Sequence, residues 1–404
     1  MLKQAIKKLG FCLLFLLASP LAFADFSWNF PEPVTPMALD TLHVHNKFMV
    51  IVAVIFIVVL AIMIYSLIKH RKSVGHKAVA DKAPSTATEI FWTLVPFAIL
   101  LLIDFVIMGI PAYHSVVMME DTRNESDMVI KVTGSQWRWQ YEYMGNTEKG
   151  SQAGLEEAKG IKFVSNLSTP QEQIDGTTAP VNDPAKPYLL DVDNRLVLPV
   201  GAKVRILMTS SDVLHNWWVP QFGSSRVAVP GFIRETWVQI DKAGTYRGQC
   251  KELCGKGHGY MPVVVDALPA EEYKVWVAAK KDEMTQAAAG SDKEWTKEDL
   301  VAEGKKVYEK NCAVCHQVTG AGLPPAFPAL TGSKIATSPI FGADGKYLPD
   351  SHLDRVLNGI RVMPSWKAIL NDTEIAAVIT YERNALGNNV GDLVQPSQVK
   401  AARQ

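Results

Sequence analysis

The sequence has little cysteine and no charge excess of either sign, and both shortages exclude whole classes of protein. Its 404 residues include 5 cysteines, while Lys plus Arg and Asp plus Glu each number 41. Balanced charge offers no basic surplus to neutralise a phosphate backbone, so nucleic acid is excluded as a partner. Apart from Cys12, the cysteines form two tight pairs, Cys250 with Cys254 and Cys312 with Cys315. None is left to join distant segments, so the pairs predict metal binding or cofactor attachment.

The first 24 residues have the three-part pattern of a signal peptide. Basic residues precede an apolar run over 11–17, and Ala22-Phe23-Ala24 follows as a small-x-small cleavage motif. We therefore predict a signal peptide over 1–24. An uncleaved membrane anchor is the alternative interpretation.

Two apolar runs, over about 48–68 and 90–110, are long enough to cross a hydrocarbon core of about 30 Å. The connector between them is rich in Lys and Arg, whereas the outer flanks are acidic. By the positive-inside rule the connector is cytoplasmic. Within 25–111, the short N-terminal arm before the first span then lies on the far side of a bacterial inner membrane, as does everything after about residue 112. Asp104 lies inside the second run, where a carboxylate indicates either a proton path or packing against a partner subunit.

The region after the second run has the pattern of an all-β domain, over 112–283. Apolar and polar residues alternate from Met128 to Tyr143, after which residues 145–187 form a long polar insertion that we expect outside the core. Further strand patterns follow over 188–192, 195–198, 203–209, 216–219, 235–240 and 262–267. Short strands separated by turn residues predict a sandwich or small barrel.

Helical patterns dominate the last third of the chain. A helix over 270–289 leads into a linker over 284–295, and Thr296 is a predicted N-cap for a helix over 297–311. A second domain over 296–390 ends with a helix near 372–386. Residues 391–404 form a polar tail that we expect to be mobile.

The loop from Cys250 to Met261 concentrates soft metal ligands. Two thiols, the imidazole of His258 and the thioether of Met261 fall within twelve residues, and interspersed glycines let the loop fold back on itself. His215, before an upstream strand, would complete the set. Zinc is the alternative metal, but zinc rarely takes a thioether, whereas copper electron-transfer sites combine His, Cys and a weak Met.

Residues 40–283 resemble subunit II of cytochrome c oxidases, which carries the two-copper centre CuA. The resemblance covers both apolar runs, the Gln136-Trp137-x-Trp139-x-Tyr141-Glu142-Tyr143 block, residues 191–195 (Asp-Val-Asp-Asn-Arg) and the cysteine loop. It implies six CuA ligands: Cys250 and Cys254 as bridging thiolates, His215 and His258 as imidazole ligands, Met261 as the axial thioether, and Glu252 through its backbone carbonyl. It also implies that the Glu252 carboxylate helps to hold a Mg²⁺ shared with subunit I.

The same resemblance implies roles for two further residues. Trp137 matches an aromatic residue at the electron-entry surface, the alternative being an ordinary exposed strand aromatic. Glu89 matches a carboxylate at the mouth of a proton channel into subunit I. A solvated acid in a first helical turn is the other reading, since the helix dipole favours acids there.

A second motif, Cys312-x-x-Cys315-His316, indicates covalent haem c. Two thiols at this spacing can form thioethers to both haem vinyls while the next residue binds iron. Met363 is the predicted sixth ligand, with His352 as the competitor. Residues 296–390 resemble a small class I cytochrome c, and the thioredoxin-like reading of the cysteine pair lacks an α/β unit to support it.

These inferences combine into one prediction of fold and function. The expected fold is multi-domain: a two-helix transmembrane hairpin, an all-β cupredoxin-like domain and a small all-α cytochrome c domain. The resemblance implies subunit II of a haem-copper oxidase, with subunit I, other oxidase subunits and a cytochrome c donor as partners. Electrons would pass from haem c to CuA and on to the dioxygen site of subunit I, with proton translocation by the complex. The alternatives are a stand-alone membrane-tethered copper or haem carrier, a copper-maturation protein, and the CuA part of a nitrous oxide reductase, for whose second copper domain the chain has no room.

Overall fold

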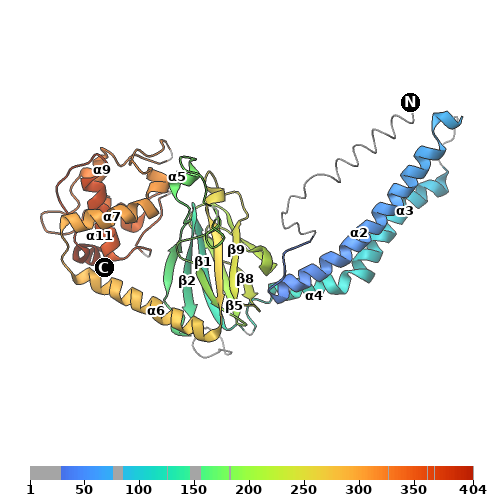
Figure 1. Ribbon diagram of the computed structural model, residues 1–404, viewed down its shortest axis with the longest axis horizontal. Helices are drawn as coiled ribbons and strands as arrows, with labels where there is room; N and C mark the ends of the chain where they lie inside the picture. Colours follow the sequence, from blue (N-terminus) through green and yellow to red (C-terminus); the bar gives the residue numbers. More distant parts are fainter. Residues whose placement is uncertain are drawn as a thin grey trace. The chain divides into compact units, whose positions relative to one another are not determined.

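The computed structural model describes residues 29–75, 85–124, 126–145, 156–181, 183–325, 327–361, 363–367 and 369–403. The predicted signal peptide over 1–24 and Cys12 lie outside the described residues. Residues 33–404 make up one unit, and the description below concerns that unit (Figure 1).

Two long apolar helices follow the N-terminal arm. Helix α2 spans Pro36–Lys69, and α3 spans Thr86–Leu101 and continues through a π-helical turn, Leu102–Ile107. Both are long and apolar enough to cross a membrane, as predicted. Helix α2 begins twelve residues before the predicted span, because Thr35 accepts a hydrogen bond from the Ala38 amide and Pro36 occupies the first turn.

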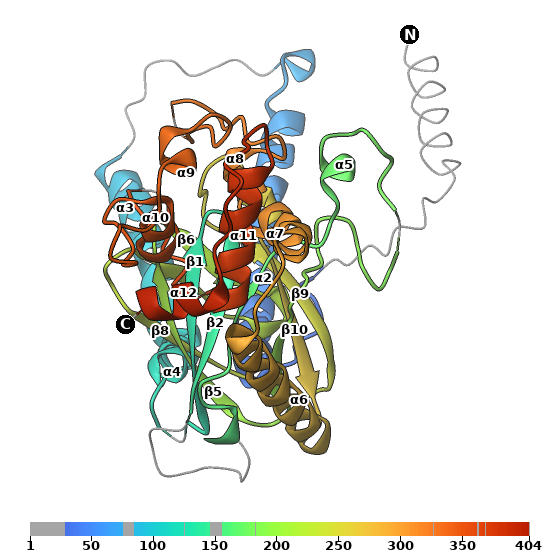
Figure 2. The ribbon, with the colours of Figure 1, turned by 90° about the vertical axis from the view of Figure 1, so that its left-hand side faces the viewer.

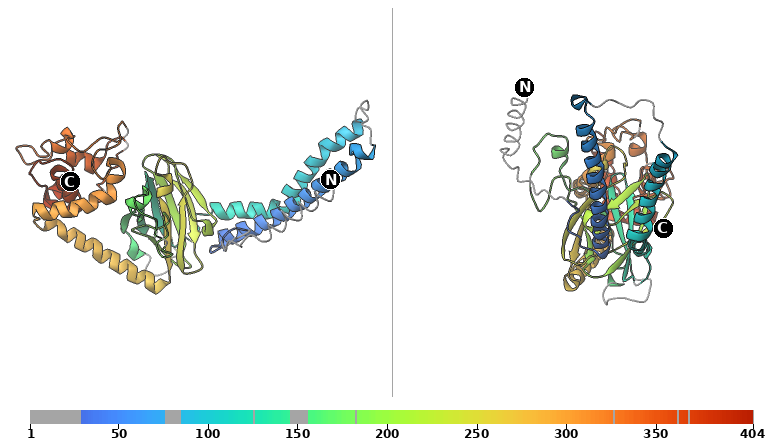
Figure 3. Two further views of the ribbon diagram at one scale, coloured as in Figure 1. Left: turned by 45° about the horizontal axis from the view of Figure 1, so that its top comes forward. Right: turned by 90° about the vertical axis from the view of Figure 1, so that its right-hand side faces the viewer.

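Helix α4, Gly109–Glu120, leads from the second span to the β-domain. It packs against α2, and the Ser115 hydroxyl donates a hydrogen bond to the Asp40 carboxylate (Figures 1 and 3). Asp104 lies in the π-helical turn and is exposed in this chain. A short 3₁₀ helix, Lys72–Val74, follows α2.

The β-domain consists of two five-stranded sheets, with strand orders β3-β2-β1-β5-β8 and β4-β10-β9-β6-β7 (Figure 1). Pairing is parallel between β1 and β5 and between β4 and β10, and antiparallel elsewhere. The strands are β1 Met128–Ser135, β2 Arg138–Gly145, β3 Lys162–Ser165, β4 Leu196–Pro199, β5 Lys203–Ser210, β6 His215–Trp218, β7 Ser225–Ala228, β8 Arg234–Gln239, β9 Gly244–Cys250 and β10 Pro262–Leu268.

The core between the sheets is built from alternating inward residues. Trp139, Tyr141 and Tyr143 of β2 are all buried, and they face Trp217 of β6 and the apolar residues of β10 in one cluster. The Trp217 indole donates to the Tyr141 hydroxyl at 3.2 Å, which satisfies a polar group that burial would otherwise leave unpaired.

One predicted strand was wrong, and three strands were not predicted. Residues 188–192 form turns rather than a strand, with one isolated bridge from Val192 to Leu167. Strands β3, β7 and β9 were not predicted, because short segments containing Gly, Arg or Lys lack a clear alternation.

The polar insertion was also misjudged in part. Within the described residues of 145–187, β3 pairs with β2, and Ala158, Ile161 and Val164 are buried. These few apolar residues add a strand to the sheet. A 3₁₀ turn, Glu156–Ala158, precedes β3, and the short helix α5, Gln171–Ile174, follows it on the surface.

The helical domain follows α6, Ala270–Ala289, and a 3₁₀ turn, Gly290–Asp292. Its helices are α7 Lys297–Asn311, α8 Ala313–His316, α9 Lys334–Thr337, α10 His352–Asn358, α11 Asp372–Asn384 and α12 Pro396–Ala402. Helices α7 and α11 lie side by side (Figure 2). A Cβ on Gly304 of α7 would overlap the Ala377 carbonyl of α11, so their close approach requires glycine.

The predicted linker and tail need correction. Helix α6 and the following turn occupy the predicted linker as far as residue 292. Residues 391–404 were expected to be a mobile tail. Within the described part of it, Pro396–Ala402 forms α12, which packs on α11, and Val394 and Val399 are buried. The Gln395 side chain donates to the Trp295 carbonyl at 2.9 Å, so apolar contacts and hydrogen bonds both hold the chain end.

Candidate metal centre and haem-attachment site

Three predicted ligands from two adjacent strands meet in the β-domain. Cys250 ends β9, His215 begins β6, and Cys254 lies in the loop after β9; one possible ligand atom from each lies within 4.8 Å of the others. All three residues are buried, and the two sulfurs are 3.9 Å apart. Pairing of β6 with β9 brings the distant histidine to the loop.

The remaining predicted CuA ligands converge on the same place. Nδ1 of His258 and Sδ of Met261 each lie 3.5 Å from Sγ of Cys254. Sγ of Cys250 lies 3.2 Å from the Glu252 carbonyl oxygen. The fold therefore gathers all six, and the set of two thiols, two imidazoles, a thioether and a carbonyl suits copper.

The orientation of His215 tests whether a metal fits. Its Nε2 lies 2.8 Å from Oδ1 of Asp212, whereas its Nδ1 is buried and has no hydrogen-bond partner among the described residues. The Gln136 amide in turn donates to Asp212 at 2.7 Å. Carboxylates that orient a ligating histidine in this way are common around metals, so an unpaired Nδ1 toward the cysteines fits a metal ligand.

The two thiols do not titrate alike. A hydrogen bond between the sulfurs lowers the pKa of Cys250 and raises the pKa of Cys254, and burial adds to the second effect. The protein alone thus favours one thiolate in the pair. A bound cation would favour deprotonation of the second thiol as well, since the thiolate is the metal-binding form.

Trp137 lies directly against the cysteine loop. Its indole N–H donates to the Cys254 carbonyl at 3.1 Å, and the Gln136 side chain donates to the same oxygen at 2.8 Å. A Cβ on Gly257 would overlap the Trp137 ring, so this glycine permits the contact. Trp137 is therefore packed against the cysteine loop rather than being a free surface aromatic.

Glu89 lies apart from this cluster in the chain. It is exposed in the first turn of α3, whose N-cap is Ser85. That placement agrees with either interpretation of Glu89 offered by the sequence.

The second cysteine pair lies at the start of the helical domain. Cys312 and Cys315 are free, half-buried thiols; Cys312 is the N-cap of α8 and Cys315 lies within that helix. His316 is buried, and its Nδ1 lies 2.8 Å from the Pro328 carbonyl. A bond that makes Nδ1 the protonated nitrogen leaves Nε2 free for iron, so these residues fit a covalently attached haem.

The two candidates for the sixth iron ligand have different surroundings. Met363 is partly buried against the helical core, in a turn closed by backbone hydrogen bonds with Ile360. His352 is buried, and its Nε2 lies 2.6 Å from the Glu382 carboxylate. That contact uses one nitrogen of His352, although its Nδ1 has no partner among the described residues.

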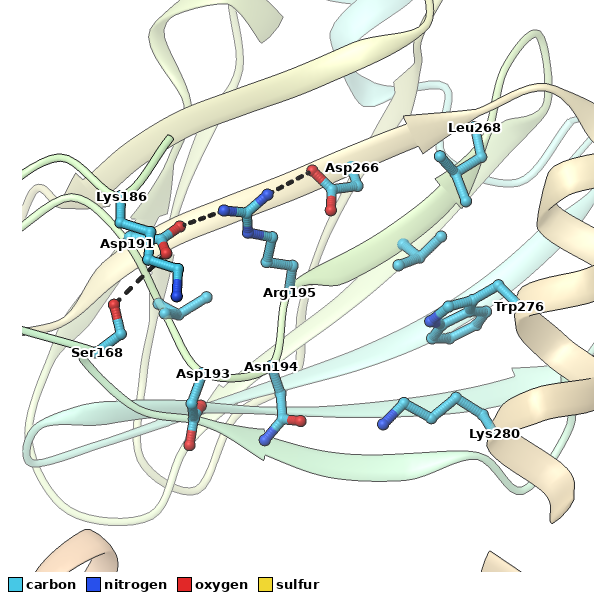
Figure 4. A pocket seen from close by; sticks show the side chains of 12 residues that line it. Ser168, Lys186, Asp191, Asp193, Asn194, Arg195, Asp266, Leu268, Trp276 and Lys280 are labelled. Atoms are coloured by element: carbon cyan, nitrogen blue, oxygen red, sulfur yellow. Dashed lines mark hydrogen bonds and ion pairs between the residues drawn. The ribbon is translucent and has the colours of Figure 1, made fainter. Parts of the chain in front are cut away.

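The 191–195 block, part of the resemblance to the oxidase family, lines a hollow of about 460 Å³ (Figure 4). Arg195 lies between two carboxylates, 2.8 Å from Asp191 and 3.6 Å from Asp266 of β10. Asp191 also accepts a hydrogen bond from Ser168 at 3.5 Å. The block therefore ties the insertion to the second sheet.

Sequence reasoning missed two residues beside these sites. Asp212 stands three positions before His215, a spacing that could have suggested a carboxylate partner for the histidine. Arg138 carries no sequence signal, and its contacts with the helical domain depend on tertiary structure.

Comparison with known proteins agrees with this geometry. Residues 24–110 match the family model of the cytochrome c oxidase subunit II transmembrane domain, and residues 128–268 match its periplasmic domain. Residues 299–381 match the model described as cytochrome c oxidase, cbb3-type, subunit III.

Individual relatives cover the first two parts. The chain is 32% identical over 252 residues to a probable cytochrome c oxidase subunit 2 of Rickettsia bellii (strain RML369-C), covering 62% of this chain and 83% of the relative. It is 32% identical over 255 residues to the subunit 2 of Chondrus crispus, covering 63% and 91%. Among solved structures, the periplasmic domain of subunit II of cytochrome oxidase from Bradyrhizobium japonicum is 34% identical, with a TM-score of 0.31 over 39% of this chain and 96% of that chain.

The fold and the ligand cluster define a membrane-anchored electron-transfer protein with a cupredoxin-like domain and a helical haem-attachment domain. The family models and the relatives identify the group more closely. The chain belongs to the cytochrome c oxidase subunit II family and carries a C-terminal cytochrome c domain. As a family member it is part of a haem-copper oxidase complex with other subunits, and its two domains imply copper CuA and haem.

Proposed function

We propose that this subunit receives electrons on haem c and passes them through CuA to subunit I, where dioxygen is reduced to water. The observation that carries the proposal is the convergence of six soft and carbonyl donors on one buried point, with Nδ1 of His215 left unpaired among the described residues. Copper bound there would supply a one-electron centre. The chain's own residues hold the donors in place, and Cys250, Cys254, His215 and Met261 are buried.

For CuA, the proposed ligands are the six that converge: His215, Cys250, the Glu252 carbonyl, Cys254, His258 and Met261. Their support is a rigid one, because β6 and β9 are paired and the loop is pinned by Trp137 and Gln136. A rigid site changes little between redox states, which favours fast transfer.

For the haem, we propose thioethers at Cys312 and Cys315, with His316 and Met363 as the axial ligands. His316 already donates toward the Pro328 carbonyl, and the pairing of His352 with Glu382 favours Met363 over His352. Met with His raises the potential of a haem, which suits an acceptor of respiratory electrons.

The finer assignments belong to the same proposal. The site lies on the outer side of a bacterial inner membrane, the donor is a cytochrome c, and Trp137 is the electron-entry residue. Glu252 contributes to a Mg²⁺ shared with subunit I, and Glu89 marks the mouth of a proton channel. The support for these points is the family resemblance together with the two apolar helices.

The test is to purify the full chain with haem attached and copper supplied, and to measure metal content. We expect two coppers per iron and a copper EPR signal with the electron shared by both ions. One zinc, or one localised copper, would refute the CuA assignment.

Paired variants separate the two sites. Cys250→Ser should remove the copper signal and leave the haem spectrum, whereas Cys312→Ser should impair haem attachment and leave the copper signal. Loss of both signals in either variant would contradict two independent sites.

A further inference from the structure

Arg138 is a buried cation between the two cofactor sites. It begins β2, directly after Trp137, and only 4% of it is exposed. One guanidinium N–H donates to the carbonyl of Asn311 at 3.3 Å, and the guanidinium carbon lies 4.4 Å from the centre of the Trp366 ring. Both partners belong to the helical domain, although Arg138 belongs to the β-domain.

The partners of Arg138 are suited to a positive charge. Asn311 is the last residue of α7, and the carbonyls at a helix C-terminus carry partial negative charge without a partner in the helix. A guanidinium also stacks well on an aromatic face. Burying a cation is costly unless such partners compensate it, so the burial of Arg138 depends on the helical domain being in place.

A second contact joins the domains beside the first. Lys310, one residue before Asn311, lies 2.9 Å from the Asp193 carboxylate of the β-domain. Lys310 is half exposed, so this ion pair contributes less than the buried contact. A hollow between the two domains is lined by Ser211 and Asp212 of the β-domain and by the turn around Met363.

The positive charge of Arg138 interacts electrostatically with Cys312 and Cys315, the haem-attachment cysteines. The same charge interacts with Asp212, which holds His215. Trp137, the residue before Arg138, donates a hydrogen bond to the Cys254 carbonyl, so two consecutive residues at the start of β2 contact the copper loop and the helical domain.

We propose that Arg138 is the positioning residue that holds the haem domain against the copper loop and sets the rate of electron transfer between them. The inference rests on the proposed function and adds to it the residue that fixes the geometry of the internal step. That step moves one electron, which oxidises ferrous haem to ferric and reduces the copper pair by one electron. No bond is made or broken, so distance and orientation control it.

The test compares Arg138→Gln and Arg138→Lys with Arg123→Gln in the full chain. Arg123 is a matched control, because it is an arginine near the start of the β-domain whose side chain is 69% exposed. A carbodiimide that joins adjacent amines and carboxylates should link Lys310 to Asp193, and mass spectrometry of the peptides measures the yield. This readout needs neither metal nor activity.

We expect Arg138→Gln to lower the cross-link yield and to slow photo-initiated haem-to-copper transfer by about tenfold, since small misplacements are costly in such reactions. The haem potential should fall, because a nearby positive charge stabilises the ferrous form. Arg138→Lys should have a haem potential close to that of the wild type, because lysine keeps the positive charge. Its rate of haem-to-copper transfer should lie between those of Arg138→Gln and the wild type. Arg123→Gln should match the wild type in cross-link yield, transfer rate and haem potential.

Equal cross-linking and equal rates in Arg138→Gln and Arg123→Gln would overturn the proposal. If Arg138→Gln fails to fold, Trp366→Leu removes the same contact from the other domain and should slow transfer similarly. An unchanged rate in Trp366→Leu would also overturn it. Failure of the proposed function is a separate result, since the wild-type chain would then lack two coppers per iron, while the cross-link would still report on docking.

Discussion

The imidazole of His215 is oriented by Asp212, whose Oδ1 lies 2.8 Å from Nε2 and leaves Nδ1 toward the two cysteines. Asp212 is fixed in turn by the backbone amide of Gln136, next to the tryptophan that packs on the copper loop. The Asp212 carboxylate therefore links His215, at the start of β6, to the backbone next to Trp137, the proposed electron-entry residue.

Asp212→Asn should weaken copper binding without removing a ligand. The amide does not accept the His215 N–H as strongly as a carboxylate, and loss of such a partner typically costs about 10–100-fold in metal affinity. Copper retention during titration with a chelator measures the effect. Asp241→Asn, an exposed acid of the same domain, is the control; equal copper retention in both variants would count against the orienting role.

Met363→Leu should abolish the low-spin Met-ligated haem spectrum while sparing the copper EPR signal. Leucine fills a similar volume but offers no sulfur to iron. His352→Ala is the companion variant, and it should keep the spectrum while losing stability, because it leaves the buried Glu382 carboxylate unpaired. A Met363→Leu chain with an intact spectrum would make His352 the better ligand.

Glu235 should make stability depend on pH in the acid range. A hydrogen bond from Arg205, with further ones from Thr122 and Arg123, lowers its pKa to about 2. A carboxyl group whose pKa is lower in the folded chain than in the unfolded chain stabilises the fold. This stabilisation is fully present at pH values above the ordinary carboxyl pKa of 4.5 and is lost as the pH falls toward about 2.

The matching variant is Glu235→Gln, measured by thermal unfolding from neutral to acid pH. It should cost about 1–3 kcal/mol near neutrality, because Arg205 loses a charge-assisted partner. The difference in free energy of unfolding between the variant and the wild type should disappear as the pH approaches 2. A gap that stays constant over this range would show that the carboxylate is not the source.

Gly257→Ala should disturb the copper loop. Its Cβ would overlap the Trp137 ring, so we expect a loss of about 1–3 kcal/mol and weaker copper binding. Gly259→Ala is a matched control two residues away, since nothing lies within 4 Å of its added Cβ. Similar effects of the two substitutions would mean that chain flexibility, rather than the contact with Trp137, governs the loop.

The sequence by itself determined the chemistry and the large elements. Cys250, Cys254, His258 and Met261 lie within one short loop, so their ligand types, above all the thioether of Met261, indicated a copper site rather than a zinc site. The apolar spans and the helix over 297–311 were equally plain, because each is a long segment whose pattern is set by local interactions and by the thickness of a membrane.

Tertiary structure decided what depends on segments far apart in the chain. Strand β3 and helix α12 form because a few apolar residues in polar surroundings find a sheet edge or a helix face that the sequence does not display. The turn at Asp212 and the contact of Arg138 with Asn311 likewise exist only in the folded chain. A ligand can be recognised from its own side chain, whereas the residues that orient it are defined by where the fold places their neighbours.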